Sequence, residues 1–167
     1  MKYCSECGSP LELKHIDGYE RYVCSREACG FVYWNNPIPV VAALVSCNGR
    51  YIVARNFAWP EGIFSVITGY LEQKETPEDA VLREVSEELG LEGRIKRHIG
   101  NYSFRKKNQV ILCYEVAAMG NIKTNHELVE YKELSPDELR AYDFSPLYIT
   151  EQIQRDWAVL NALDLMS

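Results

Sequence analysis

The sequence predicts an α/β protein in which a mixed sheet carries helices on both faces, preceded by a small cysteine-rich segment. Three observations predict this class. Strand-like apolar runs separated by turn residues recur between residues 40 and 134. An amphipathic helix follows Thr76, and another is expected over residues 147–163. Four cysteines lie within the first thirty residues, a stretch too short to bury a core unaided.

Residues 1–33 are predicted to form a zinc ribbon. Cys4 and Cys7 form a C-x-x-C pair, and Cys24 and Cys29 form a second pair with a wider, four-residue gap. Two close cysteine pairs on two turns can supply the four thiolates of a tetrahedral zinc site. Disulfides are the alternative, and a reducing compartment would disfavour them. The pattern favours structural zinc.

Residues 34–39 are expected to connect the ribbon to a second domain over residues 40–167, with two prolines stiffening the connector. Asn48-Gly49 signals a tight hairpin turn between the first two strands of that domain. Cys47 and Cys113 lie in apolar runs and are predicted to be core residues. The strands are predicted at residues 40–47, 51–55, 63–68, 94–104, 109–118 and 128–134.

The first helix of this domain has clear start and stop signals. Thr76 suits the N-cap and Pro77 the first helical position, while Gly90 suits the C-terminal end. One edge of the helix should pack on a core through the apolar stripe Val81, Leu82, Val85 and Leu89. A short helix at residues 135–139 and the helix at residues 147–163 complete the predicted elements.

Three carboxylates on the first helix point to a divalent metal. Glu84, Glu87 and Glu88 are spaced three and four residues apart, so they share one helix face with Cβ atoms roughly 5–6 Å apart. Carboxylates this close repel one another unless a hard cation such as Mg²⁺, or Mn²⁺ in its place, lies among them. A solvated acidic helix face is the alternative. Glu75 and Arg83 could brace the preceding loop, or form a plain surface ion pair.

The loop and helix together resemble a known motif. Gly69, Glu75 and the run Arg83 to Leu91 match the Nudix box at its nine constrained positions over twenty-three residues. The resemblance implies an α/β/α sandwich and a hydrolase that cleaves a nucleoside diphosphate linked to another group, using Mg²⁺ or Mn²⁺. A metal of this kind acts as a Lewis acid and lowers the pKa of a bound water.

The resemblance also implies roles for the box residues. Glu87 and Glu88 would be the main metal ligands, and Glu84 a further ligand or the base near the attacking water. Glu75 and Arg83 would orient the loop. Glu127 lies in the region where several family members place an additional carboxylate ligand or base, and it is equally compatible with a solvated loop residue.

A ribbon joined to this domain resembles two branches of the family, NADH pyrophosphatases and a group acting on FAD and ADP-ribose. Residues 101–109 lack the signature that follows the box in the NADH branch, which favours ADP-ribose or FAD. The alternatives within enzymes are an NADH pyrophosphatase and a (d)NTP pyrophosphohydrolase. A non-catalytic nucleotide sensor and a zinc-ribbon adaptor are alternatives of another class, and the intact box disfavours the sensor.

A flat base or flavin needs an aromatic surface, and phosphates favour arginine. Each of these residues could also have no contact with the substrate. Aromatic residues at strand ends often pack in the core or in a lid over a cleft, and arginines are common on protein surfaces. The predicted substrate-binding residues are Gly69 for close backbone approach, Phe57, Trp59, Tyr102 and Phe104 for stacking, and Arg55 and Arg105 for phosphates.

Composition limits the other partners. The 167 residues carry 18 Lys and Arg against 24 Asp and Glu, a net charge of −6 that disfavours extended nucleic acid. A local basic patch remains at Arg105-Lys106-Lys107. The sequence shows neither a signal peptide nor an apolar run near the ~20 residues of a membrane span, so a cytoplasmic protein with a nucleotide substrate is expected. A homodimer is compatible with the sequence.

Overall fold

The computed structural model describes residues 2–164, and its contacts divide the chain between Pro37 and Ile38. In the N-terminal part, strands β1 (Leu11–Ile16), β2 (Tyr19–Cys24) and β3 (Val32–Tyr33) form an antiparallel sheet in that order, and the 3-10 turn η1 (Glu27–Cys29) precedes β3. No helix within residues 2–164 is long and apolar enough to cross a bilayer.

The ribbon has almost no apolar core. Asp17 and Gly18 join β1 to β2 with φ angles of 50° and 83°, as a two-residue hairpin turn requires. In the described residues before Ile38, Cys4 and Cys24 are the ones that are fully buried. Because so little apolar surface is removed from water here, the segment depends on its thiols for stability.

Within residues 38–164, six strands form one mixed sheet in the order β7-β8-β4-β5-β9, with β6 also paired to β4. The central strand β4 runs parallel to β8 along its whole length. Its first half pairs antiparallel with β6 and its second half with β5, so the sheet divides near Leu44. The strands are β4 (Ile38–Cys47), β5 (Arg50–Asn56), β6 (Ile67–Tyr70), β7 (Glu92–Phe104), β8 (Gln109–Met119) and β9 (Leu128–Leu134).

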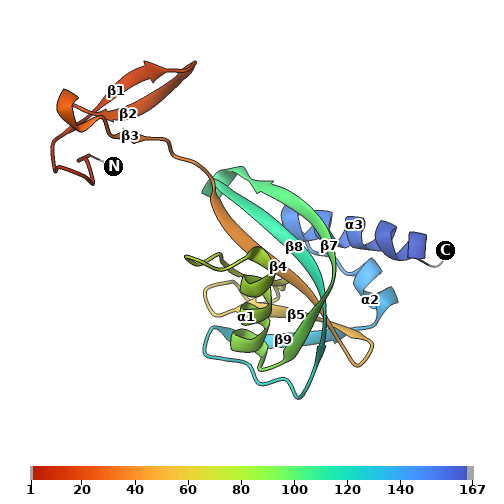
Figure 1. Cartoon of the computed structure of the whole chain (residues 1–167). Helices are drawn as coiled ribbons and strands as arrows, with labels where there is room; N and C mark the ends of the chain where they lie inside the picture. Colours follow the sequence, from red (N-terminus) through yellow and green to blue (C-terminus); the bar gives the residue numbers. More distant parts are fainter. Residues whose placement is uncertain (1, 165–167) are drawn as a thin grey trace. The chain divides into compact units, whose positions relative to one another are not determined.

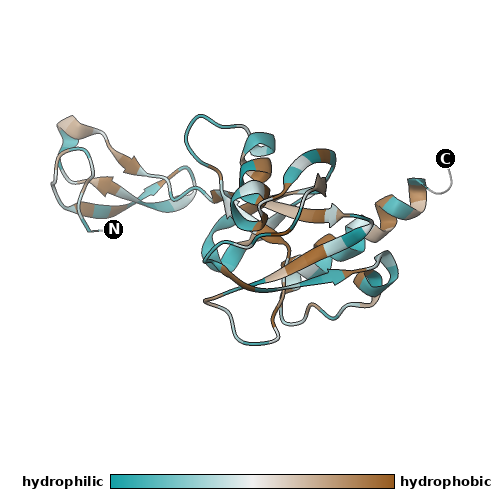
Figure 2. Ribbon diagram, turned by 90° about the horizontal axis from the view of Figure 1, so that it is seen from below, coloured by the Kyte–Doolittle hydropathy of each residue, from teal (hydrophilic) through white to brown (hydrophobic). Residues whose placement is uncertain are grey.

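Helices cover both faces of this sheet (Figure 1). Helix α1 (Pro77–Leu89) packs on one face, and α2 (Pro136–Ala141) and α3 (Tyr148–Asp164) pack on the other. Successive residues of β4 face opposite sides, so Val41 packs toward α1 and Ala42 toward α3. Hydrophobic and hydrophilic residues alternate along α3, as its one-sided packing requires (Figure 2). The predicted mixed sheet between helices is confirmed.

Several predicted boundaries differ by one to four residues, and strand pairing explains two of these differences. Ile38 and Pro39, placed in the connector by the sequence, open β4 because they pair with Gln109 and Val110 of β8. The strand predicted at residues 63–68 begins only at Ile67, since the preceding residues form a single bridge between Ser65 and Ala54. Cys47 and Cys113 are core residues, as predicted, with 5% and 0% of their surface exposed.

Helix α1 begins and ends at the predicted residues. The Thr76 hydroxyl accepts a hydrogen bond of 3.1 Å from the Asp79 amide, and Pro77 is the first helical residue. Gly90 adopts a left-handed φ of 66°, and its amide donates to the Ser86 carbonyl. The apolar stripe faces the sheet, which fixes the opposite edge of the helix, with its carboxylates, relative to the strands.

A buried ion pair fixes α3 to the sheet. Glu115 on β8 is fully buried and accepts hydrogen bonds from Tyr51 Oη (2.9 Å), Lys96 Nζ (3.0 Å) and Arg97 Nε (2.6 Å). A bulge in β7 between Ile95 and Arg97 lets two neighbouring cations reach the same carboxylate. Arg97 also binds Asp164 of α3 at 2.8 Å. Burial raises the pKa of Glu115, but the hydrogen bonds from Arg97, Lys96 and Tyr51 outweigh it and leave the pKa lowered.

Candidate active site

Gly69 lets the box loop approach α1 closely. This residue lies near the end of β6, and a Cβ atom placed on it would be 1.9 Å from the carboxyl carbon of Glu84. No other residue fits without displacing that carboxylate. The Glu84 side chain, 13% exposed, therefore lies directly against the backbone of β6.

Arg83 connects the loop to the acidic helix edge. Its guanidinium binds Glu75 at 2.8 Å and 3.2 Å, Glu84 at 2.8 Å and Glu87 at 3.1 Å. It also donates to the Tyr70 carbonyl at 3.1 Å. The hydrogen bond from Arg83 lowers the pKa of Glu75. The predicted pairing of Glu75 with Arg83 is present, and the same cation also holds two of the proposed metal ligands.

Glu88 is the most buried carboxylate of the helix edge, with 5% of its surface exposed. Burial, and then the charges of Glu84, Glu127 and Glu87, raise its pKa from 4.5 to about 8. Burial also raises the pKa of Glu84, although Arg83 partly opposes the change. The region thus concentrates negative charge where water cannot fully solvate it, which favours a bound cation.

The loop formed by residues 120–127 places Glu127 beside this cluster. The loop crosses the C-terminal end of α1, where the Lys123 backbone amide donates to the Leu89 backbone carbonyl (2.8 Å) and the Asn125 backbone amide donates to the Glu88 backbone carbonyl (3.2 Å). The Asn125 side chain then accepts from the Glu127 amide at 2.9 Å. Glu127 raises the pKa of both Glu84 and Glu88 through its charge. Its carboxylate therefore belongs to the same electrostatic cluster.

One cleft of about 1260 Å³ contains the carboxylate cluster and many of the predicted substrate-binding residues. Gly69, Trp59, Phe104 and Arg105 line it together with Glu84, Glu87, Glu88, Arg83 and Glu127. This volume exceeds the roughly 300–1000 Å³ that is usual for small-molecule sites. The cleft thus has room for a substrate that extends well beyond the metal-binding carboxylates.

Three predicted binding residues are placed differently. Tyr102 lines the cleft, but it is 6% exposed and its hydroxyl donates to Asp156 of α3 at 2.7 Å, so the ring belongs to the core and offers little stacking surface. Arg55 does not line the cleft, because the pairing of β5 with β9 sets it opposite Glu130, which it binds at 3.2 Å. Phe57 is 64% exposed and is also absent from the cleft lining.

The sequence missed several residues of the cleft. Tyr70, 56% exposed, follows Gly69, and its hydroxyl accepts a hydrogen bond of 3.4 Å from Gln109. Tyr148, 64% exposed, lines the cleft from the start of α3. The aromatic residue directly after Gly69 was a usable signal for Tyr70. Tyr148 had none, because only the packing of α3 brings it to the cleft.

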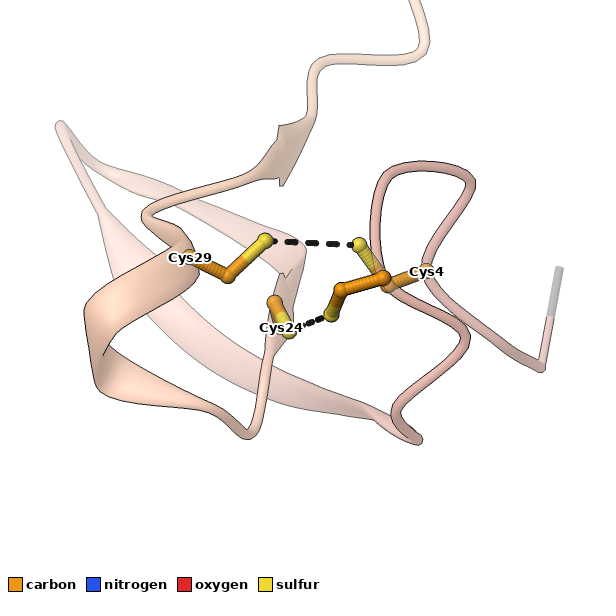
Figure 3. A group of neighbouring side chains, drawn as sticks. Cys4, Cys24 and Cys29 are labelled. Atoms are coloured by element: carbon orange, nitrogen blue, oxygen red, sulfur yellow. Dashed lines mark hydrogen bonds between the residues drawn. The ribbon is translucent and has the colours of Figure 1, made fainter.

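The four ribbon cysteines converge on one point (Figure 3). Their sulfur atoms all lie within 4.8 Å of one another, with Cys4 and Cys29 at 3.8 Å and Cys7 and Cys24 at 3.5 Å. A tetrahedral zinc with bonds of about 2.3 Å separates its sulfur ligands by roughly 3.8 Å. All four cysteines are free of disulfides. Their geometry fits a structural zinc ion.

The α1 carboxylates are more widely spread. Among residues 2–164, the four cysteines are the one group of three or more candidate ligands whose donor atoms all lie within 4.8 Å. Arg83 holds Glu84 and Glu87 through ion pairs, while Glu88 is buried beside them. Mg²⁺ keeps several waters and often binds through only one or two carboxylates, so the oxygen donors here still fit Mg²⁺ or Mn²⁺.

Comparison with protein families gives two matches, one for each part of the chain. Residues 36–152 match the model described as NUDIX domain. The chain belongs to the Nudix family. Residues 2–34 match the model described as Nudix N-terminal, which corresponds to the zinc ribbon. The box carboxylates thus belong to a Nudix domain, and the four cysteines belong to the ribbon that accompanies it in other members.

Similar proteins agree with this assignment. The mouse mitochondrial NAD(P)H pyrophosphatase NUDT13 is 30% identical over 77% of this chain and 36% of its own length. The NAD-capped RNA hydrolase NudC of Stutzerimonas stutzeri is 28% identical over 77% of this chain and 46% of its own. The chain thus aligns with less than half of each of these two relatives. A Nudix hydrolase structure from Nitrosomonas europaea shares the fold, with a TM-score of 0.73 and 23% identity over 83% of this chain and 80% of that one.

Proposed function

We propose that this Nudix protein hydrolyses the pyrophosphate bridge of a nucleoside diphosphate joined to a second large group. The observation that carries the proposal is a large cleft in which the buried acidic cluster occurs together with exposed aromatic and basic side chains. A substrate with a group on each side of the bridge can use binding energy from both ends to position the bridge.

The protein's residues have distinct parts in this reaction. A divalent cation, when bound, supplies Lewis-acid activation of the phosphate and of the attacking water. Glu88, Glu84 and Glu87 offer the oxygen donors that would hold it. Glu127 and Glu84 lie in the same cluster, and either can accept the proton of the attacking water. Arg83 fixes the loop and the helix relative to each other through its bonds to Glu75 and Glu84.

Two classes of substrate with a group on each side of the pyrophosphate bridge compete. ADP-ribose or FAD is favoured by residues 101–109, which lack the NADH-branch signature. NAD(P)H is the second candidate, because relatives named NAD(P)H pyrophosphatase and NAD-capped RNA hydrolase match 77% of the chain. Both classes carry a group on each side of the bridge, which a nucleoside triphosphate does not.

The test is a substrate panel with Mg²⁺ that includes ADP-ribose, FAD, NADH, NADPH and the common triphosphates, scored by kcat/KM and by the monophosphate products. Glu88→Gln should lower kcat by about a thousandfold or more, about 4 kcal/mol in activation free energy, with the fold retained. Glu92→Gln is the matched control, because Glu92 is an exposed carboxylate outside the cleft.

Each alternative function gives a different result. Preference for a triphosphate by tenfold or more would identify a nucleotide-pool hydrolase. Tight nucleotide binding without turnover in the presence of Mg²⁺ or Mn²⁺ would identify a sensor. Full activity of the Glu88→Gln variant would refute the assignment of the cluster as the metal site.

A further inference from the structure

We propose that the cleft prefers the form of its substrate that carries an additional phosphate monoester away from the pyrophosphate bridge, as NADPH does relative to NADH, and that the 3-10 turn η2 (Arg105–Lys107) binds this phosphate. This inference rests on the proposed function, since it concerns the far end of the same cleft. It assigns a specificity-determining role to three residues, of which the sequence singled out only Arg105 as a phosphate ligand.

The first observation is the charge of η2. Arg105, Lys106 and Lys107 are consecutive, exposed, and all line the cleft. None of the three forms an ion pair with another residue in the described part of the chain. Lys107 lies over the Phe104 ring, 5.9 Å from its centroid. The protein as a whole has a net charge of −6, so three neighbouring cations without an acidic partner contrast with its overall negative charge. Such a group attracts a multiply charged anion.

The second observation is that η2 is held in place. The Asn108 residue after it adopts a left-handed φ of 51°, and its amide donates to the Arg105 carbonyl at 3.2 Å. The Ile38 amide then donates to the Asn108 carbonyl at 2.9 Å, which ties the turn to the start of β4. A fixed turn presents its cations with less loss of conformational freedom on binding than a mobile loop would.

The third observation is the position of η2 relative to the acidic cluster. Val40 of β4 is paired with Tyr70 on one side and with Ile111 on the other. Tyr70 follows Gly69, which contacts Glu84, and Ile111 lies four residues after Lys107. Adjacent strands are about 4.8 Å apart and residues about 3.3 Å apart along them, so the Lys107 backbone lies roughly 16 Å from that of Tyr70. The long side chains of the turn line the cleft and shorten this gap. That separation suits a nucleoside between the bridge and a further phosphate.

The chemistry favours a monoester over other anions. A phosphate monoester carries a charge of about −1.5 to −2 near neutral pH and offers three acceptor oxygens. Arginine and lysine donate short, charge-assisted hydrogen bonds to such oxygens. A phosphodiester carries a single negative charge, and a free ribose hydroxyl carries none, so either would leave most of the positive charge of η2 unmatched.

The experiment uses two substrate pairs that differ only by this phosphate, NADPH against NADH and ADP-ribose 2′-phosphate against ADP-ribose. We expect kcat/KM to favour the phosphorylated member by tenfold or more in both pairs. Lys106→Glu should reduce that ratio at least tenfold. Arg94→Glu is the matched control, with the same charge change at an exposed residue of β7 outside the cleft, and should leave the ratio within twofold.

The outcomes separate this inference from the proposed function. If no substrate is hydrolysed, the proposed function fails, and calorimetric binding of adenosine 2′,5′-bisphosphate against AMP still decides the inference by the same ratio. Equal kcat/KM within each pair in the wild-type protein overturns the inference alone. Preference for a short NAD-capped RNA over NADPH that is lost in Lys106→Glu would also overturn it, because η2 would then bind phosphodiesters.

Discussion

Replacing Glu88 by Gln should stabilise the Mg²⁺-free protein at pH 8 and flatten the dependence of its stability on pH. Glu88 is 5% exposed, and its pKa in the folded protein is about 8 against 4.5 for an unperturbed carboxyl. As pH rises from 4.5 to 8, the unfolded chain loses this proton while the folded protein keeps it. The free energy of unfolding therefore falls across this window and stays low above it.

The magnitude follows from the two pKa values. Their difference, 8 − 4.5 = 3.5, corresponds to roughly 5 kcal/mol at 1.36 kcal/mol for each unit of pKa. The buried Gln amide must find new hydrogen-bond partners, at a cost of about 1–3 kcal/mol. A net stabilisation of a few kcal/mol at pH 8 remains for Glu88→Gln. At pH 5 most of this advantage should be absent.

Urea unfolding between pH 5 and 9 measures this effect, in Mg²⁺-free buffer without chelator so that zinc is retained. Fluorescence of buried Trp157 reports on the α/β part in a background with Trp34→Phe and Trp59→Phe. Glu87→Gln is the control, because the Glu87 side chain is 56% exposed. Mg²⁺ added at pH 8 should stabilise the wild type more than Glu88→Gln. Parallel pH profiles within about 0.5 kcal/mol would refute the reasoning.

Three further predictions concern other features. Gly69→Ala should lower kcat at least a hundredfold with little change in the unfolding midpoint, because the new Cβ would lie 1.9 Å from the Glu84 carboxyl carbon; unchanged kinetics would contradict this contact. Glu115→Ala should cost about 3–5 kcal/mol in urea unfolding at pH 7, because it leaves Arg97 and Lys96 without their buried partner. Since the pKa of Glu115 is lowered in the folded protein, that stabilisation should begin to fall once the pH drops below the unfolded value of 4.5 and be lost as the pH passes the lower folded pKa; a cost that is the same at acidic pH as at pH 7 would argue against the ion pair. Metal analysis should find about one zinc per chain, and Cys24→Ser should reduce it, whereas intact-mass evidence of disulfides among the four cysteines would exclude the site.

Helix α1 could be predicted in detail because all of its local signals agree. Thr76, Pro77 and Gly90 mark its ends, and its apolar stripe and carboxylates occupy separate edges. The thiol cluster of the ribbon was likewise predictable, since the spacing of its cysteines brings two turns together. In both cases the determining contacts lie close in sequence.

Residues whose roles depend on distant pairing were not predictable in this way. Arg55 was assigned to phosphate, but the register of β5 against β9 places Glu130 opposite it. Tyr102 was assigned to stacking, but α3 supplies Asp156 to its hydroxyl and buries the ring. Tyr148 was missed because only the docking of α3 brings it to the cleft. These contacts join residues that are far apart in the sequence, so they cannot be predicted from the composition of a single segment.

The parallel pairing of β4 with β8 also constrains the order in which the domain can be built. Val40 pairs with Ile111, which is 71 positions later in the chain, so the centre of the sheet closes a long loop. During synthesis, α1 leaves the ribosome well before β8 exists, and the face of β4 that packs on it lacks its parallel neighbour until then. Such non-local pairing slows folding and prolongs the exposure of apolar strands. A nascent chain halted before residue 109 therefore holds the whole box and still lacks the strand that completes the sheet around β4.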